Sequence, residues 1–326
     1  MVASSSLWVD GLRIYDTPNL AIRIVEGAPE ELTPPVLGPS SDQELLDPQV
    51  DTWLQDHRPN WTLPTLPLMS MLDRLAAAAQ REAPAQVVVG ARDVRVTGWL
   101  IFDGPRRLRT TLDGQRVKLE VWREAAKAAL SRFQPVSEGT VLLADAFEDP
   151  PAPLPPLADA QPVEQDPYKA GMLFHGPAFH LLKQLSVGSS GSSALLDAGA
   201  GAVPPGLLNQ ALLDAAVHGI LHDELHRWSK EIPERQIAYP YRVIEARFFG
   251  PAPLSGEVRC ETRLVGFDDG APGAEADPQR FPRFQIQLIV GQRVWLDLQL
   301  TEVLIPMGPH ADDRQKRIDF RERRFL

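Results

Sequence analysis

The sequence predicts an α+β fold made of two similar halves. Each half shows the same order, one helix with several antiparallel strands after it, and a proline-rich segment at 149–167 separates the halves. Proline at this density excludes helix and central strand. The simplest packing of such a repeat wraps each sheet around its own helix. We therefore divide the chain into an N-terminal repeat at 1–148, a linker at 149–167, a C-terminal repeat at 168–310 and a charged tail at 311–326.

The N-terminal repeat contains one strongly predicted helix, at 68–80. Its sequence, LMSMLDRLAAAAQ, has apolar residues at helical spacing and a run of alanines. Stretches rich in β-branched and apolar residues follow and predict strands, namely QVVVGARDVRV, GWLIF, RRLRTTL and QRVKLEVW. The last two flank Asp113-Gly114, a dipeptide typical of a hairpin turn.

The C-terminal repeat contains the second predicted helix, at 207–226. It begins after Pro204-Pro205-Gly206, which cannot lie inside a helix. A strand-like HLLKQLSVG precedes it, and four strand-like stretches follow, AYPYRVIEARFFG, EVRCETRLVGF, RFQIQLIVG and RVWLDLQLTEVLI. A loop rich in glycine, aspartate and proline at 267–280 interrupts them. The order of elements thus repeats that of the first half.

Composition excludes several classes of function. A net charge of -10 argues against binding to nucleic acid or to an anionic membrane surface. The single cysteine, Cys260, cannot form an internal disulfide, and no apolar run reaches the roughly 18 to 20 residues of a membrane span. The first residues lack the features of a signal peptide. We expect a soluble, cytoplasmic protein without a nucleic-acid or membrane partner.

The second predicted helix carries a polar stripe through an apolar sequence. Asp214, His218, His222 and His226 recur at every fourth position. Side chains four apart on a helix lie almost above one another, with a drift of roughly 40° per step. Asp214 and His218 should therefore face the same space, whereas His226 has turned away. No nucleotide-binding, zinc-protease, serine-hydrolase or zinc-ribbon motif accompanies the stripe.

Two further histidines, His57 and His175, precede the two helices. If the halves pack as a pseudo-symmetric pair, groups from both can meet at their interface, where ligand sites tend to form. A histidine can take a proton from a carbon next to a carbonyl, while an acid kept protonated by apolar surroundings gives a proton to a leaving hydroxyl. The i, i+4 spacing of His218 and His222, with Asp214, also suits a metal. Because no fourth ligand or matching motif is present, we predict no metal.

Three motifs together resemble the dehydratase domains of type I polyketide synthases. They are Asp214-xxx-His218 within LLNQALLDAAVHG, the segment FHGPAF at 174–179, and Asp56-His57 followed by LPTLPLMSMLDRLAAAA. The wording of LFHGPAF and LPLMSMLDRLAAAA is most similar to the dehydratase-like domains of bacterial polyunsaturated fatty acid synthases. The resemblance extends over most of the chain, from about residue 5 to about residue 308. It implies a double hotdog, two helix-wrapping sheets that form one pseudo-dimer.

The resemblance also implies catalytic roles. By the family pattern HxxxGxxxxP, His57 would be the general base. By the pattern DxxxQ/H, Asp214 would be the general acid and His218 its orienting partner. Gly176 and Pro177 would shape the substrate channel.

Two positions depart from the family pattern. Trp61 stands where the family has a glycine whose neighbouring N–H polarises the thioester carbonyl, and the closing proline is either Pro67, one residue late, or Pro64. An outward-facing indole would leave a slow dehydratase, and an inward-facing one would narrow or close the tunnel. His175 stands where active family members usually have tyrosine. We expect Trp61, Pro67 and His175 to contact substrate, together with Gly176, Pro177 and Phe179.

The predicted function is dehydration of 3-hydroxyacyl thioesters carried on the phosphopantetheine of acyl carrier protein, with no other cofactor. The expected partners are acyl carrier protein and neighbouring synthase domains. The sequence leaves open whether the chain also forms a homodimer. One alternative is a non-catalytic double-hotdog module that binds acyl chains or acts as a scaffold. Another is an isomerase or product-template variant of the same fold. A working dehydratase requires His57 and Asp214 to face one cavity.

Overall fold

The computed structural model describes residues 2–9, 12–21, 42–59, 63–125, 127–269, 280–307 and 314–321. The chain separates into two compact units, Met1–Leu37 with Glu124–Ser131, and Gly38–Arg123 with Arg132–Leu326. The smaller unit contains an antiparallel hairpin of β1 (Val2–Val9) and β2 (Leu12–Ala21), and a short 3-10 helix, η2 (Ala128–Leu130). The larger unit contains both repeated helices and the candidate site.

The larger unit is built on one long antiparallel sheet. Among the described residues it has twelve strands, in the order β3-β5-β6-β7-β4-β11-β14-β13-β12-β10-β9-β8. In that order the strands are β3 (Gln43–Leu46), β5 (Arg106–Asp113), β6 (Arg116–Arg123), β7 (Arg132–Ala144), β4 (Val87–Val96), β11 (Gln236–Phe248), β14 (Arg293–Pro306), β13 (Arg280–Val290), β12 (Glu257–Asp269), β10 (Gly191–Asp197), β9 (Leu182–Val187) and β8 (Gln161–Pro162).

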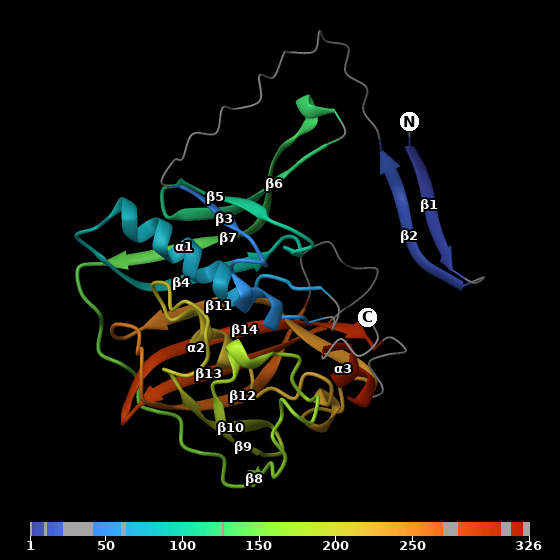
Figure 1. Cartoon of the computed structure of the whole chain (residues 1–326). Helices are drawn as coiled ribbons and strands as arrows, with labels where there is room; N and C mark the ends of the chain where they lie inside the picture. The colour runs from blue at the N-terminus through green and yellow to red at the C-terminus, as the bar shows by residue number, and fades with distance from the viewer. Residues whose placement is uncertain are drawn as a thin grey trace. The chain divides into compact units, whose positions relative to one another are not determined.

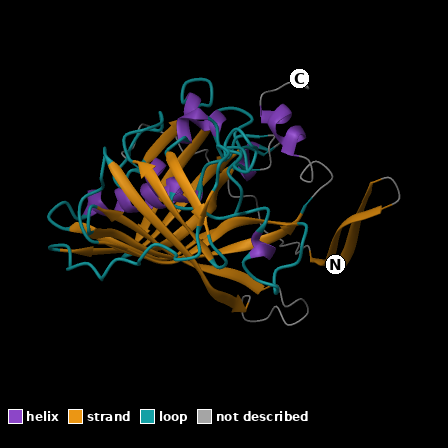
Figure 2. Ribbon diagram, turned by 90° about the horizontal axis from the view of Figure 1, so that it is seen from below, coloured by secondary structure: helices purple, strands orange, loops and turns teal. Residues whose placement is uncertain are grey.

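The strand order shows the internal repeat. In each repeat the first strand after the helix, β4 or β11, lies at the centre of the long sheet, and the next three strands run back towards it as a meander. The two central strands pair with each other, with Val94 opposite Val243 and Ala91 opposite Ala246, and all four side chains are buried. The chain therefore has the expected α+β double-hotdog fold, two helix-wrapping sheets joined edge to edge (Figures 1 and 2).

The first helix, α1 (Leu68–Glu82), confirms the prediction and extends it by two residues. It packs against β4, β5, β6 and β7 of its own repeat (Figure 1). Its apolar stripe is fully enclosed, since Leu75 and Ala76 are completely buried. The helix begins directly after Pro67, whose carbonyl accepts a hydrogen bond from the backbone N–H of Met71. The missing N–H of Pro67 costs nothing at this position, because the first residues of a helix donate no intrahelical hydrogen bond.

The second helix, α2 (Gln210–Ala215), is much shorter than the predicted helix at 207–226. It starts at Asn209, whose side chain accepts a hydrogen bond from the backbone N–H of Leu212. After Ala215 the chain continues in i→i−3 turns, and a short 3-10 helix, η4 (Leu225–Arg227), follows. His222 is held by distant segments: its Nδ1 lies 3.2 Å from Oε2 of Glu302, and its carbonyl accepts a hydrogen bond from the backbone N–H of Ala238. The prediction of a continuous helix is wrong because these partners are distant in sequence.

Some strands were also missed or wrongly predicted. The stretch GWLIF forms only an isolated bridge, Ile101 with Thr65, because its backbone pairs with the loop ahead of α1. Strands β7 and β10 were not predicted, since Pro135 and Gly139 in β7 and a serine pair in β10 weaken the strand pattern.

The linker and tail lie against the C-terminal repeat. In the linker, the backbone N–H of Leu154 binds the side chain of Gln287, and that of Leu157 binds Ser193. In the tail, the helix α3 (Arg314–Arg321) places Arg314 2.6 Å from Glu224. Among the described residues, no helix is both long and apolar enough to span a bilayer.

Candidate active site

His57 lies at the end of a 3-10 helix, η1 (Thr52–Asp56), in the loop that leads to α1. Its Nδ1 is 2.7 Å from the carbonyl oxygen of Thr65. A carbonyl only accepts, so Nδ1 carries the proton and Nε2 keeps its lone pair. The rings of Phe174 and Phe179, with centroids 5.1 and 5.6 Å from that of His57, hold the imidazole in place. His57 is therefore oriented as a proton acceptor.

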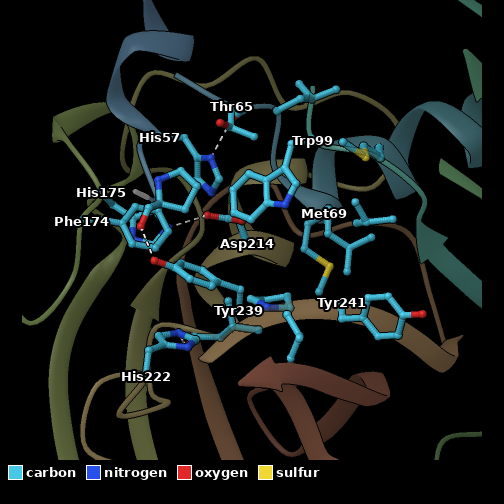
Figure 3. A pocket seen from close by; sticks show the side chains of 18 of the residues that line it. His57, Thr65, Met69, Trp99, Phe174, His175, Asp214, His222, Tyr239 and Tyr241 are labelled. Atoms are coloured by element: carbon cyan, nitrogen blue, oxygen red, sulfur yellow. Dashed lines mark hydrogen bonds and ion pairs between the residues drawn. The ribbon is translucent and has the colours of Figure 1, made fainter. Parts of the chain in front are cut away.

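Asp214 projects from α2 into the same space. Its Oδ2 lies 3.2 Å from Nε2 of His175 and 3.4 Å from Nε2 of His218. A ring nitrogen of His57, one of His175 and a carboxylate oxygen of Asp214 all lie within 4.8 Å of one another. The fold thus brings together side chains from three separate segments (Figure 3). His57 and Asp214 face one cavity, as the dehydratase hypothesis requires.

His218 is held by a tyrosine that the sequence analysis missed. The hydroxyl of Tyr168 lies 2.9 Å from Nδ1 of His218, and it also accepts a hydrogen bond from the backbone N–H of Leu182. The Tyr168 ring stacks on His180, with centroids 3.9 Å apart. Its position shortly before FHGPAF was the only local signal, and that alone does not indicate contact with His218. Tyr168 orients His218, which in turn lies against Asp214.

Asp56 is a second missed residue. Its side chain accepts a hydrogen bond from the backbone N–H of Ala178, and its carbonyl accepts one from Gly176. A Cβ on Gly176 would lie 2.4 Å from the Asp56 carboxylate, so only glycine allows this approach. Asp56 therefore joins the loop that carries His57 to the segment that carries His175.

The cavity has a volume of about 280 Å³ and runs between the two repeats. His57, His175 and Asp214 lie at one end (Figure 3). The remaining wall comes from the start of α1, the end of β4 and the loop after it, the turns after α2, and strands β11 and β14. It includes Leu68, Met69, Met71, Val96, Trp99, His222, Tyr239, Tyr241 and Val303. Most of these side chains are apolar, which suits a hydrocarbon chain.

The other residues predicted to contact substrate are placed differently. Pro67, Gly176, Pro177 and Phe179 do not line this cavity. Pro67 precedes α1, Gly176 and Pro177 pack at the η1 contact, and Phe179 is completely buried behind His57. These four support the wall of the cavity. Trp61 lies outside the described residues.

Burial controls the charges of the site. It lowers the pKa of His57, and Asp214 opposes this only in part, so the imidazole is neutral at neutral pH. Burial, with the neighbouring His218, lowers the pKa of His175 well below its usual value. Burial alone would raise the pKa of the Asp214 carboxyl, but the contacts with His175 and His218 outweigh it, and the pKa lies below its ordinary range. The expectation of an acid protonated by apolar surroundings is therefore wrong for the resting site.

His222 lies apart from this group. Its Nδ1 is 3.2 Å from Oε2 of Glu302 and its Nε2 is 3.1 Å from the carbonyl of Val217. Both ring nitrogens thus face acceptors away from Asp214, and the pairing of His218 with His222 as metal ligands does not form. His226 is half-buried.

Comparisons with known proteins show the fold. No protein-family model and no curated protein sequence matches the chain. Among solved structures, the chain is similar to an isomerase-inactive variant of GphF DH1, with 19% identity over 85% of this chain and 96% of that one, and a TM-score of 0.61. It is similar to the dehydratase domain from the CurF module of curacin polyketide synthase, with 15% identity, 82% and 95% coverage and a TM-score of 0.60. It is also similar to a trans-AT polyketide synthase dehydratase domain from Brevibacillus brevis, with 16% identity over 81% of this chain and 93% of that one, and a TM-score of 0.57.

These likenesses establish that the chain has the double-hotdog fold of polyketide synthase dehydratase domains. The similarity in wording to polyunsaturated fatty acid synthases stays a prediction.

Proposed function

We propose that the protein is a dehydratase that eliminates water from 3-hydroxyacyl thioesters. The observation that carries the proposal is the convergence of a ring nitrogen of His57 and a carboxylate oxygen of Asp214 to within 4.8 Å, at the end of a largely apolar cavity. The two groups come from different repeats, so the pairing depends on the double-hotdog arrangement. The shared fold with polyketide synthase dehydratase domains supports the proposal.

In the proposed reaction His57 is the base. The lone pair on its Nε2 takes the proton from the α-carbon, and the electrons of that C–H bond form the double bond to the β-carbon. The C–O bond at the β-carbon breaks, and the hydroxyl leaves as water with a proton from the Asp214 group. The hydrogen bond from Nδ1 to Thr65 supports the imidazolium that forms. Return of the proton from His57 to the Asp214 group completes the cycle.

The proton for the leaving hydroxyl is shared by Asp214 and His175 in this proposal. Their oxygen and nitrogen are 3.2 Å apart, so the two groups titrate as a unit, and in this proposal the pair takes up one proton when substrate binds. His218, fixed by Tyr168, holds the same carboxylate oxygen in position. In this proposal His175 therefore belongs to the acid, and it also lines the cavity, where a contact with substrate was expected from the sequence.

The substrate class follows from the cavity and the resemblance. The apolar wall suits an acyl chain, and the resemblance implies a chain delivered on the phosphopantetheine of acyl carrier protein, within a larger synthase. Acid–base elimination needs no additional cofactor in this scheme.

The testing experiment is a dehydration assay on synthetic 3-hydroxyacyl-pantetheines of short and long chain length. We expect conversion to the 2-enoyl product, and hydration of that product in the reverse direction, both followed by mass spectrometry. A Trp61→Gly variant measured alongside tests the departure at that position. Saturable binding of acyl-pantetheine without turnover in either direction would favour the non-catalytic acyl-binding module. Activity in Trp61→Gly alone would show that the tryptophan closes the site.

Double-bond isomerisation is the second candidate. It requires proton removal at one carbon and proton delivery at another, and the site has a second imidazole, His175, beside Asp214. The ring centroids of His57 and His175 are 5.3 Å apart, so two proton carriers flank the same space. NMR analysis of the product decides this, because isomerisation places the double bond at carbon 3.

A further inference from the structure

Buried polar atoms that lack a hydrogen bond of good geometry are concentrated around Asp214. Among the described residues they are both ring nitrogens of His175, Oδ2 of Asp214 and Nε2 of His218, although both Nε2 atoms lie 3.2–3.4 Å from that oxygen. A buried polar atom left unpaired is destabilising, and such atoms in proteins normally meet a partner group, water or an ion. Four of them in one place indicate a site that accommodates a small polar species.

The same atoms form a set of donors that suits zinc. Two imidazole nitrogens and one carboxylate oxygen, from His57, His175 and Asp214, lie within 4.8 Å of one another and are all buried. In a tetrahedral site with bonds of about 2.0–2.2 Å, neighbouring ligand atoms are about 3.3 Å apart. The 3.2 Å separation between His175 and Asp214 already matches this spacing. His57 has to approach by at most about 1.5 Å.

The surroundings of His57 also fit a metal ligand. Its Nδ1 donates to the carbonyl of Thr65, which leaves Nε2 as the free lone pair. Metal-bound histidines typically donate their second ring nitrogen to a carbonyl or carboxylate in this way. The cavity gives access to the group and leaves space for a water as fourth ligand. His218, whose Nε2 lies 3.4 Å from the same oxygen of Asp214, has its ring centroid 4.0 Å from that of His175.

We propose that His57, His175 and Asp214 bind one Zn²⁺ ion, and that zinc inhibits dehydration at this site. The ion occupies the lone pair of the base and the carboxylate of the acid, so neither can transfer a proton while zinc is bound. The inhibition rests on the proposed function, whereas the binding does not. His175 completes the set of three zinc ligands, because a tyrosine at this position would offer a phenol in place of an imidazole.

Calorimetric titration of the intact chain with ZnCl₂ at pH 7.5 tests the binding. We expect one zinc per chain, and at least a hundredfold weaker binding in His175→Phe, which keeps an aromatic ring against Phe174. The matched control is His226→Gln, which removes a half-buried histidine outside the group and should bind zinc like the wild type. Circular dichroism of each variant verifies the fold. Co²⁺ provides a second measurement, because its visible absorption reports nitrogen and oxygen ligands directly.

Absence of saturable binding in the wild type would overturn the proposal. So would equal affinity in wild type and His175→Phe, or loss of binding in His226→Gln. The dehydration rate is then measured against zinc concentration, with recovery on addition of EDTA. Stoichiometric zinc binding without loss of rate would refute the inhibition. Zinc binding to a chain with no dehydratase activity would refute the proposed function and leave the zinc site intact.

Discussion

Each repeat has a buried aspartate on its helix, Asp73 on α1 and Asp214 on α2, and both are 4% exposed. Their electrostatics are opposite. Burial raises the pKa of Asp73, and the backbone N–H of Leu208, 2.6 Å from its Oδ1, offsets this only in part. At Asp214 burial also acts to raise the pKa, but two histidines lower it below the ordinary range. Equal burial therefore gives different chemistry, because the partners differ.

The two repeats contribute differently to the site. Asp73 binds the backbone of the segment that leads into α2, so the N-terminal repeat positions the helix that carries Asp214. Gly206, in a left-handed conformation with φ of +67°, allows this contact, since a Cβ there would lie 2.1 Å from the Asp73 carboxylate. The N-terminal repeat thus contributes His57 and a support for the proposed acid, and the C-terminal repeat contributes Asp214, the proposed acid.

The largest expected effect distinguishes the two aspartates by rate. Asp214→Asn should lower turnover of a 3-hydroxyacyl-pantetheine by about 10²- to 10⁴-fold, because an amide cannot deliver a proton. Asp73→Asn should lower it by less than about tenfold, because Asp73 transfers no proton and its effect passes only through the position of α2. His218→Ala should have an effect between these two. Wild-type turnover in Asp214→Asn would contradict the assignment of the acid.

The second expected effect concerns the contribution of Asp73 to the stability of the fold. Asp73→Ala removes the acceptor for the N–H of Leu208 and should lower the free energy of unfolding by about 1–3 kcal/mol, measured in urea. Asp73→Asn keeps an oxygen at that position and serves as the matched control. An unfolding midpoint in Asp73→Ala equal to that of the wild type would show that the link between the helices is not stabilising.

A core substitution tests whether α1 is mainly structural. Leu75 is completely buried, so Leu75→Ala should lower the free energy of unfolding by about 2–5 kcal/mol. Because Leu75 contacts none of the reacting groups, the turnover per folded molecule should change by less than about threefold at temperatures where the variant is folded. A large loss of rate with unchanged stability would mean that α1 participates in the site beyond packing.

The smallest expected effect concerns pH. Burial acts to lower the pKa of His222, but Glu302 prevails and raises it above the ordinary value. A raised pKa means that the folded state binds the proton more tightly. This stabilisation is complete below about pH 6.5, the unfolded value, and is lost as the pH rises through the folded pKa. Urea midpoints measured from pH 6 upwards should fall, and the fall should be smaller in His222→Gln. An identical slope in both proteins would exclude the His222–Glu302 contribution.

Much of the fold was predictable because its signals are local. The periodicity of LMSMLDRLAAAAQ identified α1 to within two residues. The same reasoning failed for 207–226, where His222 is held by Glu302 and Ala238, both distant in sequence, and the regular helix ends at Ala215. Asp214 and His218 nevertheless remain neighbours, since tight turns also bring residues four apart close together. The prediction of this pair thus held although the helix assumed for it is mostly absent.

The sequence by itself determined the two repeats, the strand-rich halves and the identity of His57, Asp214 and His218 as candidate groups. These depend on spacing along the chain and on resemblance to known motifs. Only the tertiary structure decided that His175 lies against Asp214, that Tyr168 holds His218, and that Asp73 supports α2. Each is a contact between segments distant in sequence, and the packing of the whole sheet sets its distance. The protonation of Asp214 belongs with them, because burial and partners set a pKa, and neither is a property of the residue alone.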